Sequence, residues 1–137
     1  MEKGYLHWKA DILTEFDPFE TGLYRFVTLD KDAFIGKDAL DKRQAAGPVK
    51  RLVSMTLDDD TAPAHGGASV MQGDRVIGTV TSGGWGYRVG KNIAYAFVDP
   101  ELATQGTAFE IDVLGKRVAA AVVAPGLYDP EMARVRG

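Results

Sequence analysis

The chain is organised around one stretch, residues 71–99, in which two β-rich runs are joined by a glycine-rich connection. Gly73-Asp74 opens the first run, and glycine tolerates the positive φ angles that close a tight hairpin. The run Arg75–Ser82 then alternates in character, which predicts Val76 and Val80 on one face of a strand. The stretch therefore predicts a β-hairpin around which neighbouring strands must assemble.

The same alternation places Ile77, Thr79 and Thr81 on the opposite face. Gly78 lies in the middle of this run, where glycine often marks a bulge or a close approach of another backbone. A loop is expected next, because the glycines are closely spaced: Gly83, Gly84, Gly86 and Gly90. This loop carries three large side chains that we expect to form an inter-domain contact, Trp85, Tyr87 and Arg88. The chain then re-enters a strand.

Six short strands at regular spacing are predicted after residue 48. They are Val49–Leu57, Ala68–Gln72, Arg75–Ser82, Asn92–Val98, Ala108–Leu114 and Arg117–Ala124. In the first of them Val53, Met55 and Leu57 share a face, and in the fifth Phe109, Ile111 and Val113 point inward. Such a series is typical of a small antiparallel barrel or sandwich.

Residues 1–47 have a mixed α/β character. The apolar run Leu23–Leu29 predicts a strand, and a helix is expected from about Lys37. Gly47 is suited to end that helix, and Pro48 prevents its continuation. Aromatic and polar residues are dense at the very start of the chain, where free termini usually fray. We therefore expect the chain to begin partway into a larger protein.

Composition excludes several classes of function. The net charge is −3 with no basic run, so nucleic acid is not expected as a partner. No apolar segment approaches membrane-spanning length, so we expect no membrane partner. The absence of cysteine rules out disulfides, thiolate metal ligands and a thiol nucleophile, and it suits a reducing compartment.

Candidate chemistry within the chain is sparse. His7 and His65 are far apart and lack a carboxylate at metal-ligand spacing, so packing for His7 and an exposed loop for His65 are favoured over zinc. Residues 58–60 are three aspartates, better explained by a solvated loop than by a calcium site. Ser82 has no histidine nearby and is expected to be a strand-end hydroxyl. We expect neither a metal site nor a catalytic residue in this chain.

Four stretches in register resemble the C-terminal part of the folate-binding aminomethyltransferase family. This family includes the glycine cleavage T-protein and the matching regions of dimethylglycine and sarcosine dehydrogenases. The stretches are Met1-Glu2-Lys3-Gly4-Tyr5-Leu6-His7-Trp8 with Asp11, Pro18-Phe19-Glu20-Thr21-Gly22-Leu23, Phe34-Ile35-Gly36-Lys37-Asp38-Ala39-Leu40 and Gly78-Thr79-Val80-Thr81-Ser82-Gly83. Asn92-Ile93-Ala94, Gly106-Thr107 and Val122-Val123 extend the resemblance. The residue pattern of the first stretch resembles the dimethylglycine and sarcosine dehydrogenase branch more than the glycine cleavage protein itself.

The resemblance implies a mainly β fold, a six-stranded antiparallel barrel preceded by a short α/β segment of a folate-binding domain. It implies a tetrahydrofolate-dependent one-carbon transfer from glycine, dimethylglycine or sarcosine. Glu2 stands where the family has a carboxylate that accepts hydrogen bonds from the pterin ring, and Lys31 stands near a basic residue that meets the folate tail. The assisting aspartate of the family belongs to its N-terminal half, and the dehydrogenase branch carries a flavin (FAD) domain further upstream.

We therefore divide the chain into residues 1–47, the tail of the folate-binding region, and residues 48–137, the barrel domain that caps the folate site. The expected partners are folate and the N-terminal half of a longer enzyme, in the cytoplasm or, in a eukaryote, the mitochondrial matrix. This chain alone is expected to be inactive. The alternative is a self-contained barrel that binds a partner through Trp85, Tyr87 and Arg88 without catalysis.

Overall fold

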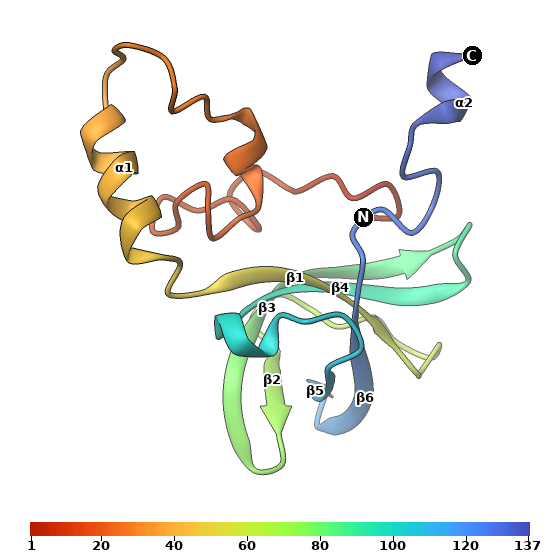
Figure 1. Cartoon of the computed structure of the whole chain (residues 1–137). Coiled ribbons are helices and arrows are strands. Elements are labelled where there is room, and N and C mark those ends of the chain that lie inside the picture. The colour runs from red at the N-terminus through yellow and green to blue at the C-terminus, as the bar shows by residue number, and fades with distance from the viewer.

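The computed structural model describes all residues from 1 to 137. Its centre is a closed barrel of six antiparallel strands in the order β1-β4-β3-β2-β5-β6, and β1 closes the ring by pairing with both β4 and β6 (Figure 1). The strands are β1 (Arg51–Leu57), β2 (Ser69–Gln72), β3 (Arg75–Gly86), β4 (Lys91–Val98), β5 (Ala108–Val113) and β6 (Lys116–Val123). Closure leaves no open sheet edge along the ring. The predicted mainly β fold with a six-stranded barrel is confirmed.

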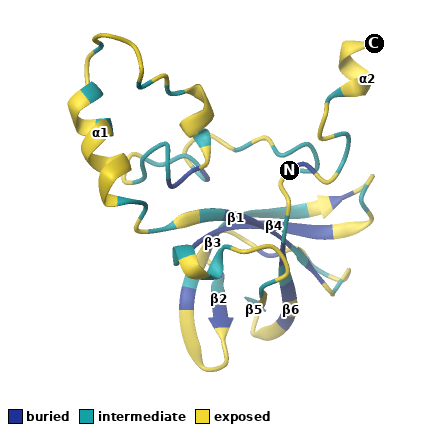
Figure 2. Cartoon of the chain, in the orientation of Figure 1, coloured by how far each residue is buried: buried dark blue, intermediate teal, exposed yellow.

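The barrel is filled by the alternating apolar side chains of its strands, and the ribbon is dark blue at the buried residues in Figure 2. Val53, Met55 and Leu57 of β1 are all buried, as the alternation predicts. In β5, Phe109, Ile111 and Val113 are also buried, while the residues between them are partly exposed. This apolar burial is the main stabilising contribution to the fold.

The predicted faces of β3 are wrong, because a β-bulge at Ile77 shifts the register of the pairing with β2, and the pairing with β4 shifts at Thr81. Val70 pairs with Gly78 and Met71 pairs with Val76, so Ile77 is an extra residue on β3. A bulge reverses the alternation from that point. Ile77 is consequently buried in the core together with Val80, while Val76 is 57% exposed.

The expected loop after Ser82 is a continuation of β3, which runs to Gly86 and pairs with β4 as far as Lys91. The glycines serve close packing here. A Cβ on Gly83 would lie 2.1 Å from the carbonyl oxygen of Ala64, and one on Gly78 would lie 2.3 Å from that of Phe97. The turn itself is short, between Gly86 and Lys91.

The loop that follows β1 contains the three aspartates at residues 58–60. It forms more polar contacts than the prediction of a solvated loop suggests. The Nδ2 of buried Asn92 donates to the carbonyls of Asp59 (2.7 Å) and Ala62 (3.0 Å). The Asp59 carboxylate accepts from Thr61 and pairs with Lys116. The Lys116 hydrogen bond, followed by those of Thr61, holds the pKa of Asp59 well below its ordinary value. Asp58 and Asp60 are exposed, as expected.

The predicted strand over Leu23–Leu29 is wrong. The segment before the barrel contains the 3-10 helix η1 (Leu23–Phe26) and the helix α1 (Lys37–Ala46), and no strand. η1 follows Gly22 at φ 76°, and the apolar run has no neighbouring strand with which to pair. The predicted helix is confirmed: it begins at Lys37 and ends before Gly47.

Two short elements and the chain ends complete the fold. η2 (Pro100–Leu102) links β4 to β5, and α2 (Ala133–Arg136) ends the chain. The segment between β6 and α2 passes beside the N-terminus in Figure 1, where the Tyr128 N–H donates to the carbonyl of Glu2 (2.9 Å) and the Lys3 ammonium pairs with Asp129 (2.7 Å). None of the helices is long and apolar enough to cross a membrane.

Candidate functional site

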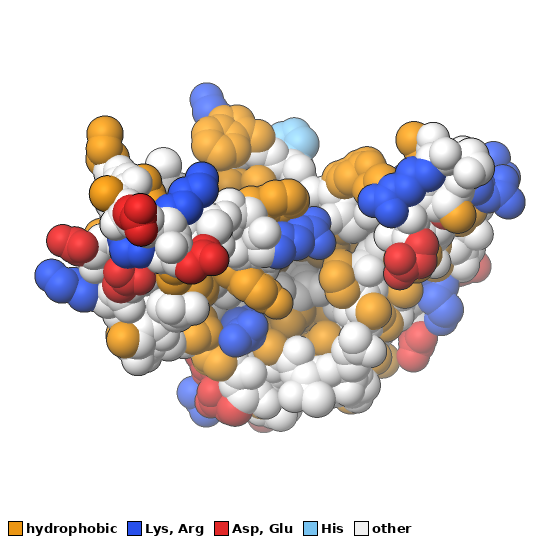
Figure 3. All heavy atoms as spheres, turned by 45° about the horizontal axis from the view of Figure 1, so that its top comes forward, with side chains coloured by type: hydrophobic (Ala, Val, Ile, Leu, Met, Phe, Trp, Pro, Cys, Tyr) orange, Lys and Arg blue, Asp and Glu red, His pale blue; other side chains and the backbone are white.

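One concave surface between the N-terminal segment and the barrel is a hollow of about 640 Å³, called here the upper hollow. Its walls come from residues 4–12, from residues 21–26 around η1, and from the ends of β1 and β6. Figure 3 shows hydrophobic side chains on both sides of a depression between two raised lobes of the molecule. Its volume is in the range typical of small-molecule sites.

Few polar groups line the upper hollow. Tyr95 is 2% exposed, and its hydroxyl donates to the carbonyl of Met1 at 3.0 Å. Burial, and after it the negative charge of Asp11, raises the pKa of Tyr95 to about 12, so this side chain is a neutral donor at physiological pH. At the rim, the Arg25 guanidinium lies 4.9 Å from the ring centre of Phe26 and forms no ion pair. The hollow is thus an apolar surface with one free cation at its edge.

Asp11 fixes the first wall to the barrel. It is 1% exposed, and its carboxylate accepts the backbone N–H of His7 (2.8 Å), the hydroxyl of Thr81 and the hydroxyl of Ser82 (2.6 Å). Three donors offset the cost of burying the charge. The Ser82 hydroxyl therefore donates to Asp11 from within β3, so the prediction that it lies at the end of a strand is wrong. The His7 side chain is exposed, so the packing role expected for it is wrong.

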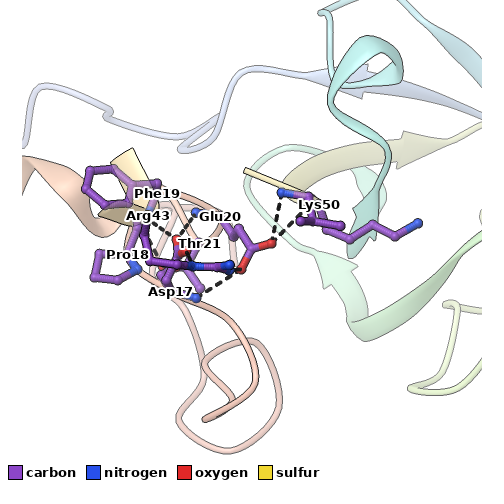
Figure 4. Close-up of polar contacts among 8 residues, drawn as sticks. Asp17, Pro18, Phe19, Glu20, Thr21, Arg43 and Lys50 are labelled. Atoms are coloured by element: carbon purple, nitrogen blue, oxygen red, sulfur yellow. Dashed lines mark hydrogen bonds and ion pairs between the residues drawn. The ribbon is translucent and has the colours of Figure 1, made fainter. Parts of the chain in front are cut away.

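Glu20 fixes the second wall. Its side chain is 3% exposed, and Oε1 accepts the backbone N–H groups of Val49 (3.2 Å) and Lys50 (3.1 Å). Oε2 accepts the N–H of Asp17 (3.1 Å) and lies 3.5 Å from the Arg43 guanidinium. Figure 4 shows this carboxylate reaching from the N-terminal segment to the backbone that leads into β1.

Asp17 extends the same cluster. Its carboxylate accepts the N–H groups of Phe19 (2.8 Å) and Glu20 (3.0 Å) and pairs with Arg43 of α1 (2.7 Å). The Leu52 N–H also donates to the carbonyl of Glu20 at 2.8 Å. The segment before the barrel is thereby connected to both α1 and β1, which orients the wall of the upper hollow.

Glu2 lies beside the β3–β4 turn. Its Oε1 accepts the backbone N–H groups of Arg88 and Val89 (3.0 Å), and Oε2 accepts no hydrogen bond. The structure thus brings two of the sequence-predicted residues, Glu2 and Arg88, into contact. One carboxylate oxygen caps the turn, and the other is free to accept a hydrogen bond.

Lys31 belongs to the loop between η1 and α1, and Figure 1 shows this loop away from the N-terminus. Its side chain is exposed and forms no ion pair. Its carbonyl accepts a hydrogen bond from the Lys37 ammonium (2.6 Å), which also binds the carbonyl of Leu29. The structure therefore does not bring Lys31 together with Glu2.

The three residues predicted as a contact surface lie around the β3–β4 turn. Trp85 is on β3 and 36% exposed, and Tyr87 in the turn is 86% exposed. The Arg88 guanidinium is 5.9 Å from the ring centre of Tyr128. These side chains form an exposed aromatic and cationic tip.

The sequence reasoning assigned no role to Asp11, Glu20 or Arg25. The partners that join Asp11 and Glu20 to the barrel are distant in the sequence, up to 71 residues for Asp11, so no local spacing indicates them. Arg25 has no ion-pair partner that could have indicated it. A signal did exist for Glu20, because it lies within an Asp-Pro-x-Glu pattern in which the aspartate accepts N–H groups two and three residues on.

The closed barrel, and the N-terminal segment held to it by buried carboxylates, define a β-barrel domain with an open concave face. Residues 50–129 match the family model described as the glycine cleavage T-protein C-terminal barrel domain. Because the match covers more than half of the chain, the chain belongs to this family.

Curated relatives extend the similarity over the whole chain. Mitochondrial dimethylglycine dehydrogenase of Rattus norvegicus is 36% identical over 137 residues, covering 99% of this chain and 16% of the relative. An aminomethyltransferase of Alkaliphilus oremlandii is 39% identical over 118 residues, covering 86% and 32%. Mitochondrial sarcosine dehydrogenase of Mus musculus is 32% identical over 146 residues, covering 100% and 16%.

A solved structure shows the same architecture. The crystal structure of glycine cleavage system aminomethyltransferase T from Bartonella henselae superimposes with a TM-score of 0.87 at 25% identity, covering 94% of this chain and 37% of that one. The chain thus spans between 16% and 37% of the length of these similar proteins.

Proposed function

We propose that this chain is the C-terminal part of a tetrahydrofolate-dependent aminomethyltransferase-type protein and closes one side of its folate site. In this proposal residues 1–47 end the folate-binding region and residues 48–137 are the barrel domain that caps it. Membership of the T-protein barrel family and the aminomethyltransferase relatives support this assignment.

The observation that carries the proposal is the open, apolar upper hollow. Its rim presents two aromatic side chains to solvent, Tyr5 (60% exposed) and Phe26 (73% exposed). Folates are built from planar aromatic rings and end in carboxylates, which suit an apolar wall with the Arg25 cation at its edge. A ligand pocket normally encloses most of its ligand. A second wall from the region that precedes this chain would complete the enclosure.

Of the one-carbon donors, we favour a methylated glycine over glycine. The dimethylglycine and sarcosine dehydrogenases match 99–100% of the chain, and the Alkaliphilus aminomethyltransferase matches 86%. In this proposal the longer protein carries FAD in an upstream domain and, in a eukaryote, works in the mitochondrial matrix. The names of the dimethylglycine and sarcosine dehydrogenase relatives describe them as mitochondrial.

Glu2 is proposed to bind the pterin through the free Oε2, since Oε1 is occupied by the β3–β4 turn. An ionised carboxylate accepts hydrogen bonds from the amino and ring N–H groups of a pterin. Lys31 is proposed to attract the folate carboxylates as an exposed point charge from the loop before α1. Trp85, Tyr87 and Arg88 are proposed to contact the preceding region.

The test is a tetrahydrofolate titration of two proteins by calorimetry. One is the 137-residue chain, and the other is a chimera in which this chain replaces the matching region of the Alkaliphilus aminomethyltransferase. We expect binding and aminomethyl transfer by the chimera, and weak binding without turnover by the chain. A folded chimera that does not bind tetrahydrofolate overturns the proposal.

Glu2→Gln in the chimera tests the pterin contact. The amide places a donor where an acceptor is needed, and we expect a loss of about 2–3 kcal/mol of folate affinity. Asp58→Asn, at an exposed position, is the matched control. Melting temperatures of both variants separate lost binding from a weakened β3–β4 turn. Equal dissociation constants for Glu2→Gln and the parent chimera exclude Glu2 from the site.

A self-contained interaction barrel is the second candidate. The observation in its favour is that the barrel is closed and has its own apolar core. The same titration distinguishes it, because a self-contained module binds its ligand equally well in the chain and in the chimera.

A further inference from the structure

A second concave surface is separate from the upper hollow. It is a groove of about 790 Å³ between the N-terminal residues 9–16 and the β3 residues 75–81, called here the side groove. The two cavities share no lining residue. The side groove therefore requires its own explanation.

The floor of the side groove is apolar. Phe16 stacks on Phe97 with the ring centres 3.6 Å apart, which joins the N-terminal segment to β4. Val76 lines the groove and is 57% exposed, because the β-bulge turns its neighbour Ile77 into the core. Gly78 contributes no side chain, which keeps the groove open beside Phe97. The bulge thus creates an exposed apolar surface that a regular strand would not have.

The walls of the side groove are cationic. The charged residues that line it are Lys9, Lys50, Arg75 and Asp99. Lys50 pairs with Asp99 at 2.7 Å, and the charge of Arg75, after that of Lys50, also helps to lower the pKa of Asp99. Neither Lys9 nor Arg75 lies within ion-pair distance of a carboxylate. Three cations face one carboxylate here, although the whole chain has a net charge of −3. The local excess of positive charge, away from the sign of the whole molecule, favours an anionic ligand.

We propose that the side groove binds a small amphipathic organic anion. An aromatic or branched apolar body packs on Phe16 and Val76, and an acidic group of the carboxylate or sulfonate type meets the unpaired charge of Lys9 or Arg75. The volume, the apolar floor and the few charged groups at the walls are those of a small-molecule site. Because its walls come from the N-terminal segment and from β3, an occupant stabilises the docking of the segment on the barrel. This inference does not depend on the proposed folate site.

The test uses 8-anilinonaphthalene-1-sulfonate as the probe, titrated into the 137-residue chain and followed by its fluorescence. We expect saturable binding of one equivalent. N-Phenyl-1-naphthylamine has the same rings without the sulfonate, and we expect it to bind at least about tenfold more weakly. Arg75→Ala and Lys9→Ala should together weaken the sulfonate about tenfold or more, which corresponds to about 1.4 kcal/mol.

Two further variants separate the side groove from general surface binding. Val76→Glu places a negative charge on the apolar floor at an exposed position and should abolish probe binding without unfolding the chain. Lys42→Ala removes an exposed α1 cation without an ion pair and should leave binding unchanged. Melting temperatures establish that each variant is folded.

Several outcomes overturn the inference. Absence of saturable binding, or binding that resists both Arg75→Ala with Lys9→Ala and Val76→Glu, shows that the side groove is not an anion site. Displacement of the probe by tetrahydrofolate shows that the groove is part of the folate site. Binding to the chain but not to the folded chimera shows that a neighbouring domain covers the groove.

Discussion

A buried carboxylate is stable only when its oxygens meet donors, and Glu20 meets this condition with donors on both oxygens. Oε1 accepts two backbone N–H groups at the entrance to β1, and Oε2 accepts the Asp17 N–H and faces Arg43. The charge therefore joins three parts of the chain that apolar contacts alone would not hold in register. This one residue connects local sequence to the position of the whole N-terminal segment.

Glu20→Gln is expected to destabilise the chain by about 2–3 kcal/mol, measured as the free energy of unfolding in urea. Whichever way the amide turns, its NH₂ group faces donors where an oxygen is required. Glu15→Gln is the matched control, since Glu15 is exposed and accepts no hydrogen bond. A cost for Glu20→Gln no larger than for Glu15→Gln contradicts the assignment.

The buried Tyr95 phenol is expected to make the free energy of unfolding fall at alkaline pH. Burial raises its pKa from 10.0 to about 12, so the folded chain favours the neutral phenol. The resulting stabilisation is fully present below pH 10 and is lost as the pH rises through 12. We expect Tyr95→Phe to flatten this decline in thermal unfolding between pH 9 and 12, and to lower stability at neutral pH by about 1 kcal/mol through loss of the bond to the Met1 carbonyl.

Tyr87→Phe is the control for this pH dependence, because Tyr87 is 86% exposed. It should retain the decline of the wild-type chain. Identical pH profiles for the wild-type chain and Tyr95→Phe show that the phenol does not couple to folding.

At the scale of the elements, strands with regular alternation were predictable and the irregular strand was not. In β1 and β5 the apolar residues that stand at every second position are buried, so an alternation of period two identifies both the strand and its inward face. In β3 the bulge inserts Ile77, and only the pairing with β2 reveals it. Gly78 carried the single local signal of that irregularity.

The closely spaced glycines of β3 predict a loop that the structure does not contain, for a related reason. Glycine is typical of turns, but it also occurs where another backbone approaches closely. Gly83 is of the second kind, because the Ala64 carbonyl occupies the space of a side chain. The candidate site was predictable only in part. The sequence indicated Glu2 as a site residue, but the contact of Glu2 with the Arg88 N–H and its separation from Lys31 depend on tertiary structure.

Gly83→Ala is therefore expected to destabilise the chain by about 1–3 kcal/mol, because the new Cβ would lie 2.1 Å from a backbone oxygen that cannot move freely. Gly84→Ala is the neighbouring control. Its Cβ would meet only the flexible Met1 Sδ at 3.6 Å, an ordinary contact. Urea unfolding of the two variants decides the matter, and equal stability for both rejects the close-packing explanation.

At the scale of the whole molecule, apolar burial is concentrated in the barrel and scarce in the segment that precedes it. Neither η1 nor α1 has a buried residue. Phe26 is 73% exposed and Ile35 is wholly exposed. Polar clusters around Asp11 and Glu20, more than apolar packing, hold this segment on the barrel. Large apolar side chains exposed together typically mark a contact surface.

The double variant Phe26→Ser/Ile35→Ser tests whether this surface meets the preceding region of a longer protein. In the isolated chain both side chains are in water, so we expect the free energy of unfolding to change by no more than about 0.5 kcal/mol. In the Alkaliphilus chimera, the same change should remove buried apolar area and weaken both domain docking and tetrahydrofolate binding. The expected loss is about 1.5–3 kcal/mol for each side chain that is fully buried there.

Val135→Ser on α2, which is 73% exposed, is the matched control. Limited proteolysis of the junction and unfolding in urea measure the docking. If the double variant leaves the chimera as stable as Val135→Ser does, the exposed segment is not the contact surface, and Trp85 and Tyr87 at the β3–β4 turn remain as the exposed aromatic alternative.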